Sequence, residues 1–360
     1  MEAKKTVGIG LLGAWHKYIY KFSNMMFKGF EKKRHWIYPC KYPECRAIAA
    51  WDDNLERGQA LADEYGVRFE TDLDKFLADP EIDAVIICMP TTQHDELILK
   101  AANAGKHIYV EKSPFSTVEG AYLAREAIRK NNVHFMVSSP MDKRRNRFAK
   151  GLADAGELGK ITEVRFRLYD RWALDADEPV GILNKQENGG GALIDYGQHG
   201  IHILNWFLGM PVRCSAHFGY VTEFAKKHQI EDNACVVYEF EDGALGIVET
   251  GWTAPDHECV LDVYGTNGRV HVNGDLRYFQ EDGERVIFDD VSYSIAGGNM
   301  ISIPEDDLPA PNLYPLRYWV DCIVNNTPVE RQNIDEAVAW TEMLMAAYRA
   351  VEAGESVSLR

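Results

Sequence analysis

The alternation of strands and helices in the first 139 residues constrains the fold of this chain more than any other feature. Short apolar runs occur at 6–12, 46–52, 84–90, 107–112 and 134–139, and helical periodicity separates them at 55–66, 94–105 and 118–132. Strands that alternate with helices of about 10 to 15 residues form right-handed βαβ units, which build a parallel sheet. The sequence therefore predicts a doubly wound parallel sheet in residues 1–140.

Beyond residue 160 the pattern changes to longer runs in which apolar and polar residues alternate. These runs lie at 163–172, 212–224, 233–252, 259–274 and 276–290, and a final helical stretch lies at 335–354. Such alternation is typical of an antiparallel sheet with one face covered. We therefore expect a second, α/β domain at 141–360 that contains a large, mostly antiparallel sheet, with the boundary near Ser139–Asp142.

Charge and composition exclude several classes of protein. The chain has 39 basic and 55 acidic residues and a net charge of −16, so it has no sequence-independent attraction for nucleic acid. No run reaches the roughly 18 to 20 apolar residues that span a bilayer, and the first residues lack a signal peptide. The cysteines, and the histidines at 217, 228 and 257, have no metal-ligand spacing. We expect a cytoplasmic protein without a metal, membrane or nucleic-acid partner.

A glycine-rich segment follows the first predicted strand. Gly8, Gly10 and Gly13 match the G-x-G-x-x-G pattern of dinucleotide-binding turns. Because 7–12 is an apolar run suited to a buried parallel strand, we place the turn at Gly13. The other two glycines then either pack within the strand or belong to the turn. The loop expected to meet the cofactor pyrophosphate consists of Gly13, Ala14, Trp15 and His16.

Two carboxylates, Asp52 and Asp53, follow the second predicted strand. An acid at this position binds the ribose hydroxyls of NAD and repels the 2′-phosphate of NADP, so we expect NAD rather than NADP. The interval from Gly13 to Asp52 is 39 residues, whereas about 20 are usual. An insertion at 14–45, rich in basic and aromatic residues, accounts for the difference. It is either a lengthened helix with a solvated loop or a contact to substrate or to another subunit.

Two longer segments make a family resemblance specific. Residues 72–114 contain a P-x-x-x-H turn followed by A-x-x-x-G-K-H-x-x-x-E-K, and 189–199 read G-G-G-x-L-x-D-x-G-x-H. Both resemble the Gfo/Idh/MocA oxidoreductases, and the resemblance covers nearly the whole chain in the expected order. It implies an NAD(P)-binding Rossmann domain, a C-terminal α/β domain with a mostly antiparallel sheet, and a homodimer or homotetramer formed through that sheet.

The resemblance also assigns site residues. On the cofactor side it points to Pro90, Thr91, Thr92, His94, Glu111 and Lys112. Lys112 is expected to reach both cofactor and substrate. The family usually has proline directly after Glu-Lys, but here Ser113 intervenes, so the turn that aims Lys112 can differ.

Asp195 and His199 are four residues apart, so on a helix both point to one face, where a carboxylate can orient an imidazole. The resemblance places them in the substrate pocket. His199 would take the hydroxyl proton, with Asp195 orienting it and Lys112 polarising the substrate or relaying the proton. The candidate substrate contacts Arg171, Trp172 and Asn188 can equally belong to the sheet surface.

The activity implied is that of an NAD-dependent dehydrogenase that oxidises a secondary hydroxyl of a sugar, glycoside or cyclitol to a ketone by hydride transfer. Two alternatives stay open. One is a glycosidase of the same fold that retains NAD and acts through transient 3-oxidation. The other is a nucleotide-dependent regulator, because fold does not determine function.

Overall fold

The structure is a computed structural model that describes residues 6–29, 36–37, 41–278 and 285–359. The chain divides into two compact units, one formed by Met1–Pro140 with Asn312–Thr341 and the other by Met141–Pro311 with Glu342–Arg360. Helix α11 (Ile334–Ala353) contains the point at which the chain passes from the first unit to the second. Within the described ranges, no helix combines the length and the apolar character needed to cross a membrane.

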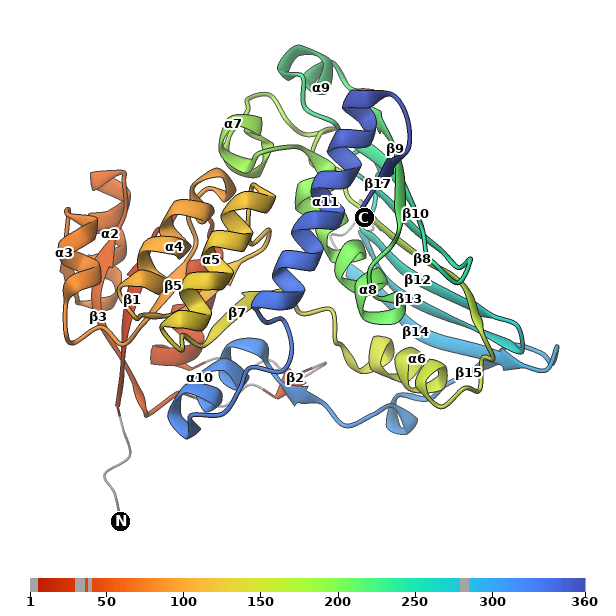
Figure 1. Ribbon diagram of the computed structural model, residues 1–360, viewed down its shortest axis with the longest axis horizontal. Coiled ribbons are helices and arrows are strands. Elements are labelled where there is room, and N and C mark those ends of the chain that lie inside the picture. The colour runs from red at the N-terminus through yellow and green to blue at the C-terminus, as the bar shows by residue number, and fades with distance from the viewer. Residues whose placement is uncertain (1–5, 30–35, 38–40, 279–284, 360) are drawn as a thin grey trace. The chain divides into compact units, whose positions relative to one another are not determined.

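The first unit is built on a parallel sheet of six strands in the order β4-β3-β1-β5-β6-β7 (Figure 1). Its strands are β1 (Val7–Leu12), β3 (Cys45–Trp51), β4 (Arg68–Phe69), β5 (Ala84–Ile87), β6 (His107–Glu111) and β7 (Phe135–Ser138). Every residue of β1, β5 and β7 is buried, as expected for strands covered on both faces. The apolar runs of the first 139 residues thus form the predicted doubly wound sheet.

The connecting segments of this unit are mostly helical. They are α1 (Tyr18–Ser23), the π-helix η1 (Asn24–Lys28), α2 (Leu55–Tyr65), α3 (Leu73–Ala78), the 3-10 turn η2 (Thr91–Gln93), α4 (His94–Asn103) and α5 (Val118–Lys130). A short parallel pair, β2 (Trp36–Ile37) with β16 (Asn312–Leu313), and helix α10 (Pro315–Asn325) complete it. The caps explain several helix starts, since Asn54, Asp72 and Thr117 each accept a backbone N–H at the start of α2, α3 and α5.

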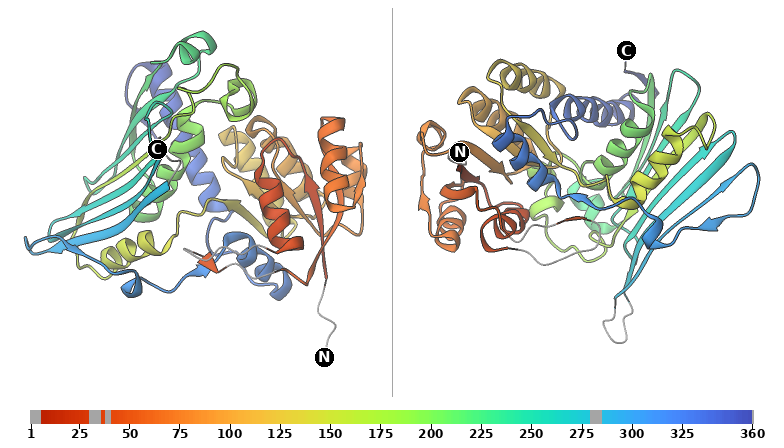
Figure 2. Two further views of the ribbon diagram at one scale, coloured as in Figure 1. Left: turned by 180° about the vertical axis from the view of Figure 1, so that it is seen from behind. Right: turned by 90° about the horizontal axis from the view of Figure 1, so that it is seen from below.

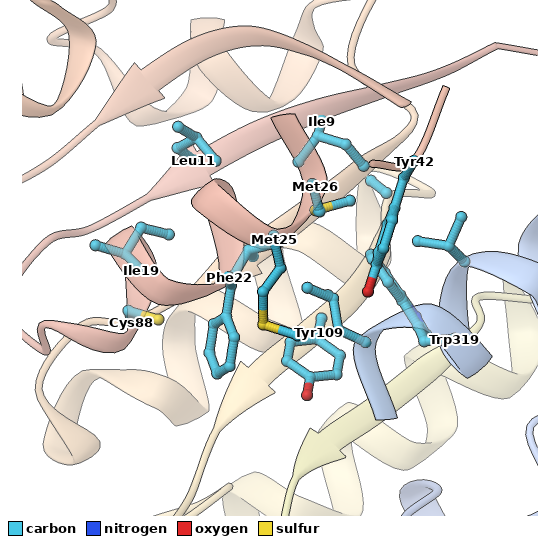
Figure 3. Packing of buried hydrophobic residues seen from close by; sticks show 14 of the residues in the cluster. Ile9, Leu11, Ile19, Phe22, Met25, Met26, Tyr42, Cys88, Tyr109 and Trp319 are labelled. Atoms are coloured by element: carbon cyan, nitrogen blue, oxygen red, sulfur yellow. The ribbon is translucent and has the colours of Figure 1, made fainter. Parts of the chain in front are cut away.

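Residues 312–341 belong to the first unit, although the sequence predicts the second domain as one stretch from 141 to 360. The reason is the apolar face of α10, since Leu316, Trp319 and Val320 are fully buried in the core of the first unit. Figure 3 shows Trp319 beside Tyr109 of β6 in this core, and the ring centroids are 5.6 Å apart. Because the apolar periodicity of a helix does not reveal its packing partner, the sequence did not predict this return.

The described part of the 14–45 insertion contributes to the same core. Helices α1 and η1 bury Ile19, Phe22, Met25 and Met26 (Figure 3). This favours the lengthened-helix interpretation for 18–28, while residues 30–35 and 38–40 lie outside the described residues. Residues 18–28 of the insertion therefore extend the hydrophobic core of the first unit.

The second unit contains a sheet of nine strands in the order β15-β14-β13-β12-β8-β11-β10-β9-β17. Its strands are β8 (Ile161–Tyr169), β9 (Arg213–Gly219), β10 (Asn233–Glu239), β11 (Leu245–Gly251), β12 (Glu258–Gly265), β13 (Gly268–Tyr278), β14 (Arg285–Ile295), β15 (Ile301–Ser302) and β17 (Val357–Ser358). Only β8 and β11 pair in parallel among the described strands of this sheet. The predicted mostly antiparallel sheet is therefore present.

Helices cover one face of this sheet (Figure 2). The helical segments of the unit are α6 (Arg144–Asp154), η3 (Gly181–Leu183), α7 (Lys185–Asn188), the π-helix η4 (Leu193–Gly197), α8 (Gln198–Leu208), α9 (Glu223–His228) and η5 (Glu305–Asp307). Gly200 lets α8 approach the sheet, because a Cβ there would lie 2.8 Å from Val248 and 2.9 Å from Phe166. The run 212–224 is a strand only as far as Gly219, because the Thr222 side chain accepts the Ala225 N–H and begins α9.

Candidate functional site

The turn after β1 lies at Gly13, where the sequence places it. Gly13 has φ +90°, and a Cβ at this position would lie 2.1 Å from Met89 Sδ, so only glycine fits. Its N–H donates to Trp51 O at 2.8 Å, and the N–H of His16 donates to Cys88 O at 3.0 Å. The turn is therefore held between the carboxyl ends of β3 and β5, where doubly wound sheets bind their ligands.

Gly8 and Gly10 lie inside β1 and not in the turn. A Cβ on Gly8 would lie 1.8 Å from Glu81 O, and one on Gly10 would lie 2.6 Å from Phe76 Cζ. Close packing of neighbouring segments on β1 explains both glycines.

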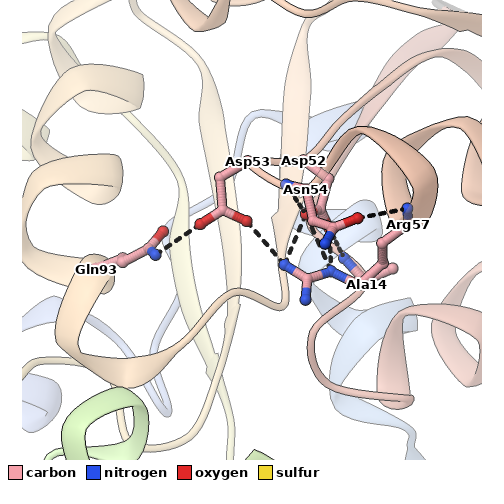
Figure 4. A network of polar contacts seen from close by, with 6 residues as sticks. All are labelled: Ala14, Asp52, Asp53, Asn54, Arg57 and Gln93. Atoms are coloured by element: carbon pink, nitrogen blue, oxygen red, sulfur yellow. Dashed lines mark hydrogen bonds and ion pairs between the residues drawn. The ribbon is translucent and has the colours of Figure 1, made fainter.

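Asp52, directly after β3, has a fully buried side chain whose carboxylate is occupied by protein donors (Figure 4). Oδ2 accepts the Ala14 N–H at 2.7 Å, and Oδ1 accepts the Asn54 N–H at 2.8 Å. Arg57 donates to both oxygens, from Nε at 2.9 Å to Oδ2 and from Nη2 at 2.7 Å to Oδ1. Asp52 thus links the glycine turn to helix α2.

Asp53 is in a different position from its neighbour. Its side chain is 43% exposed, and Oδ1 accepts from Arg57 Nη2 at 2.8 Å. Its second oxygen accepts from Gln93 Nε2 at 2.9 Å (Figure 4). Gln93 lies in the Pro90–His94 turn, so one polar network connects the glycine turn, the two acids and the turn after β5.

Within that turn, Pro90, Thr91 and His94 are buried and Thr92 is exposed. His94 Nδ1 lies 2.8 Å from Ser113 O and Nε2 lies 3.0 Å from Met89 O. Burial lowers the pKa of His94, so the ring is neutral near pH 7 and donates to one of the two carbonyls. His94 therefore ties the turn after β5 to the segment after β6, and its ring lies inside the unit.

Glu111 ends β6 and is buried, while Lys112 is partly exposed. The peptide bond between Lys112 and Ser113 is cis. Lys112 belongs to the first unit, and Asp195 and His199 belong to the second. That the three act together stays a prediction.

The Asp195–His199 pair lies where the π-helix η4 passes into α8. Asp195 is buried, and its Oδ2 accepts from Trp252 Nε1 at 3.3 Å. His199 is partly exposed on the following turn. Single π-helical turns inside α-helices are frequent at functional sites. His202, one turn further, is buried, and burial lowers its pKa to about 3, so its ring is an uncharged part of the interior.

The three candidate substrate contacts differ in accessibility. Arg171 is partly exposed and forms an ion pair with Asp175, with Nε 2.6 Å from Oδ2. Trp172 is 46% exposed, and its Nε1 donates to Tyr196 Oη at 2.7 Å. Asn188 is buried, and its Nδ2 donates to Gly190 O at 3.2 Å, so it supports the loop before η4.

The structure adds residues that sequence reasoning missed. Asp170 accepts from Tyr196 Oη at 3.1 Å, and His257 Nδ1 lies 3.2 Å from the same Oδ2. These residues come from three separate stretches of the chain, so no local motif could reveal them. Trp252, the partner of Asp195, was missed for the same reason.

Comparison with known proteins identifies the class and then the family. Residues 9–139 match the model described as an oxidoreductase family with an NAD-binding Rossmann fold, so the chain is an NAD-binding oxidoreductase. Residues 146–271 match the GFO/IDH/MocA C-terminal domain, and the chain belongs to the GFO/IDH/MocA family.

Relatives and solved structures agree with this assignment. The chain is 29% identical over 329 residues to scyllo-inositol 2-dehydrogenase (NAD(+)) of Bacillus subtilis, covering 88% of this chain and 90% of that protein. It is 26% identical over 298 residues to levoglucosan dehydrogenase of Pseudarthrobacter phenanthrenivorans, covering 75% and 73%. A solved levoglucosan dehydrogenase complex with NADH shares the fold, with a TM-score of 0.78 at 19% identity over 99% of this chain and 100% of that one.

Proposed function

We propose that the protein is an NAD-dependent dehydrogenase that oxidises a secondary hydroxyl of a sugar, glycoside or cyclitol to a ketone. The observation that carries this proposal is the buried Asp195 carboxylate one turn before the partly exposed His199 imidazole. A carboxylate in this relation to an imidazole orients the ring and stabilises its protonated form. Removal of a hydroxyl proton requires such a base.

The residues of the first unit fit NAD. The Gly13 turn has no room for a side chain, which is typical of turns that approach a pyrophosphate closely. When NAD is bound, its nicotinamide accepts the hydride that leaves the substrate carbon. We propose that Asp53 accepts hydrogen bonds from the adenosine ribose, because Asp53 is 43% exposed, whereas the Asp52 oxygens already accept from Ala14, Asn54 and Arg57.

The remaining roles belong to side chains of both units. His199 accepts the hydroxyl proton, Asp195 orients His199, and Lys112 polarises the substrate oxygen. Trp172, which is 46% exposed, offers an aromatic ring that is suited to stack on the apolar face of a sugar ring. The relatives named for inositol, levoglucosan and glucosides support a polyhydroxylated ring as substrate.

The oligomeric state is part of the same proposal. We propose a homodimer or homotetramer formed through the nine-stranded sheet. Size-exclusion chromatography with light scattering measures it directly, and a monomer at micromolar concentration would contradict it.

The first test is the near-ultraviolet absorbance of NADH in mixtures of the purified protein, NAD or NADP, and a panel of hexoses, inositols, uronates and aryl glycosides. We expect NADH to appear with one substrate class and little NADPH. No reduction with any substrate, together with nucleotide released on denaturation, would instead support a glycosidase that retains its cofactor. Catalytic inactivity with a biological effect that survives substitution of Lys112, Asp195 and His199 would support a regulator.

A further inference from the structure

A chain of hydrogen bonds connects residues from separate stretches of the second unit. Trp172 Nε1 donates to Tyr196 Oη at 2.7 Å, and Tyr196 Oη donates to Asp170 Oδ2 at 3.1 Å. His257 Nδ1 lies 3.2 Å from the same oxygen, and the Arg171 N–H donates to Asp170 Oδ1 at 2.7 Å. Asp170 is therefore the centre of a built polar cluster.

The ionisation of Asp170 determines which ring nitrogen of His257 carries the proton that faces it. Burial alone would raise the pKa of Asp170, but the hydrogen bonds from His257, the Arg171 N–H and Tyr196 lower it below its usual value. An ionised carboxylate only accepts hydrogen bonds, so the His257 proton must lie on Nδ1. Whenever the ring carries this one proton, Nε2 is a lone-pair acceptor. The side chain is 28% exposed, which leaves the ring accessible to a ligand.

This cluster lies beside the proposed catalytic pair. Asp170 follows β8, and its N–H donates to Gly251 O at 3.0 Å at the end of β11. The next residue, Trp252, donates to Asp195. Tyr196 directly follows Asp195 in η4. Two carboxylates with different partners are thus presented at one end of the β8–β11 pair.

We propose that His257, oriented by Asp170, is a binding residue that accepts a hydrogen bond from a hydroxyl of a polyol substrate other than the hydroxyl that is oxidised. This inference rests on the proposed function. A ring with several hydroxyls offers such a donor, and the half-exposed Trp172 in the same cluster offers an apolar surface for the ring itself. Tyr196 and the Arg171 N–H already donate to Asp170. Asp170 therefore does not need the partly exposed His257 as a third donor for a purely structural role.

The first experiment determines the tautomer of His257 without any substrate. Nitrogen-15 NMR of the ring nitrogens in the full-length protein, assigned by comparison with His257→Asn, distinguishes protonated Nδ1 from protonated Nε2. For the neutral form of the ring we expect the proton on Nδ1 in the wild type, and loss of this preference in Asp170→Asn. A ring protonated on Nε2 would overturn the proposal, because no acceptor would then face the substrate.

The second experiment compares the most rapidly oxidised polyol of the panel with its monodeoxy analogues. We expect the wild-type kcat/KM to fall roughly 10- to 100-fold for one analogue that keeps the oxidised hydroxyl. The amide of His257→Asn can replace Nδ1–H but not Nε2. In this variant the ratio of kcat/KM for the parent polyol to kcat/KM for that analogue is expected to fall toward one. The matched control His217→Asn changes an exposed histidine of β9 in the same unit and should discriminate as the wild type does.

The outcomes separate this inference from the proposed function. A His257→Asn protein that reduces NAD with unchanged discrimination against every monodeoxy analogue overturns the inference and leaves the dehydrogenase intact. A wild-type protein that reduces no cofactor with any polyol overturns both.

Discussion

The two units hold the carboxylates of their candidate sites in different ways. In the first unit, the Asp52 carboxylate meets the Arg57 guanidinium through both oxygens, so its charge has a permanent cationic partner. In the second unit, Asp195 accepts from the neutral indole N–H of Trp252, and Asp170 accepts from a phenol, a backbone N–H and an imidazole. A carboxylate that arginine binds through both oxygens is suited to hold structure, whereas one that accepts from an indole or a phenol and lies beside a histidine is suited to proton transfer.

The largest effect that would test this contrast concerns His199. His199→Ala should lower kcat by a factor on the order of 10² to 10⁴, because no side chain then accepts the hydroxyl proton. NAD affinity, measured by fluorescence titration, should stay nearly unchanged. His217→Ala, at an exposed position of the same unit, is the control. An unchanged turnover would remove His199 from the mechanism.

The buried His202 of the second unit makes the stability of the protein depend on pH. Burial lowers the pKa of His202 to about 3, below the ordinary 6.5, so the unfolded chain binds more protons between these values. Stability due to this residue is therefore complete above pH 6.5 and is lost as the pH falls toward 3, by up to roughly 4 kcal/mol.

Thermal unfolding followed from pH 7 to pH 4 checks this prediction. His202→Leu should show a shallower fall in Tm than the wild type, and the exposed His217→Leu should match the wild type. Equal slopes for His202→Leu and the wild type would show that folding does not lower the pKa of His202.

Removal of the negative charge of Asp52 should lower the stability of the first unit. Asp52→Asn removes the buried anionic partner of Arg57 and is expected to destabilise the protein by about 2 to 4 kcal/mol. Thermal unfolding measures the loss, and Asp53→Asn, at the exposed neighbour, is the control with a small change. A Tm for Asp52→Asn equal to that of Asp53→Asn would contradict the assignment of Asp52 as the structural acid.

The smallest expected effect concerns cofactor choice. Asp53→Ser should weaken NAD binding about tenfold and strengthen NADP binding, because it removes a ribose acceptor. It also removes the Asp53 acceptor of Arg57 Nη2, so that this nitrogen can donate to the 2′-phosphate while it keeps its hydrogen bond to Asp52. Dissociation constants for both nucleotides measure this without any substrate. Glu56→Ser changes an exposed acid in the first turn of α2 and should alter neither constant. If NADP affinity rises equally in Asp53→Ser and in Asp53→Ser with Arg57→Ala, Arg57 is not the phosphate ligand.

Sequence patterns predicted much of the fold because they act locally. The apolar run at 7–12 forms β1, the turn begins at Gly13, and the alternating runs after residue 160 form the mixed sheet. For the candidate sites, the pattern placed Asp195 and His199 one turn apart, which the π-helical start of α8 preserves. The sequence failed where a choice depended on a distant partner, as for the return of α10 to the first unit. The end of β9 was missed although its signal is local, since Thr222 caps the start of α9.

By itself, the sequence determined the succession of apolar strand segments along the chain, the glycine that the turn at position 13 requires, and the presence of two acids after β3. These features depend on neighbours along the chain, so a linear pattern contains them. Only the tertiary structure decided that Asp52 is buried against Arg57 while Asp53 stays accessible. It alone brought Asp170 and His257, 87 residues apart, into one cluster, because hydrogen bonds and burial depend on which distant segments pack together.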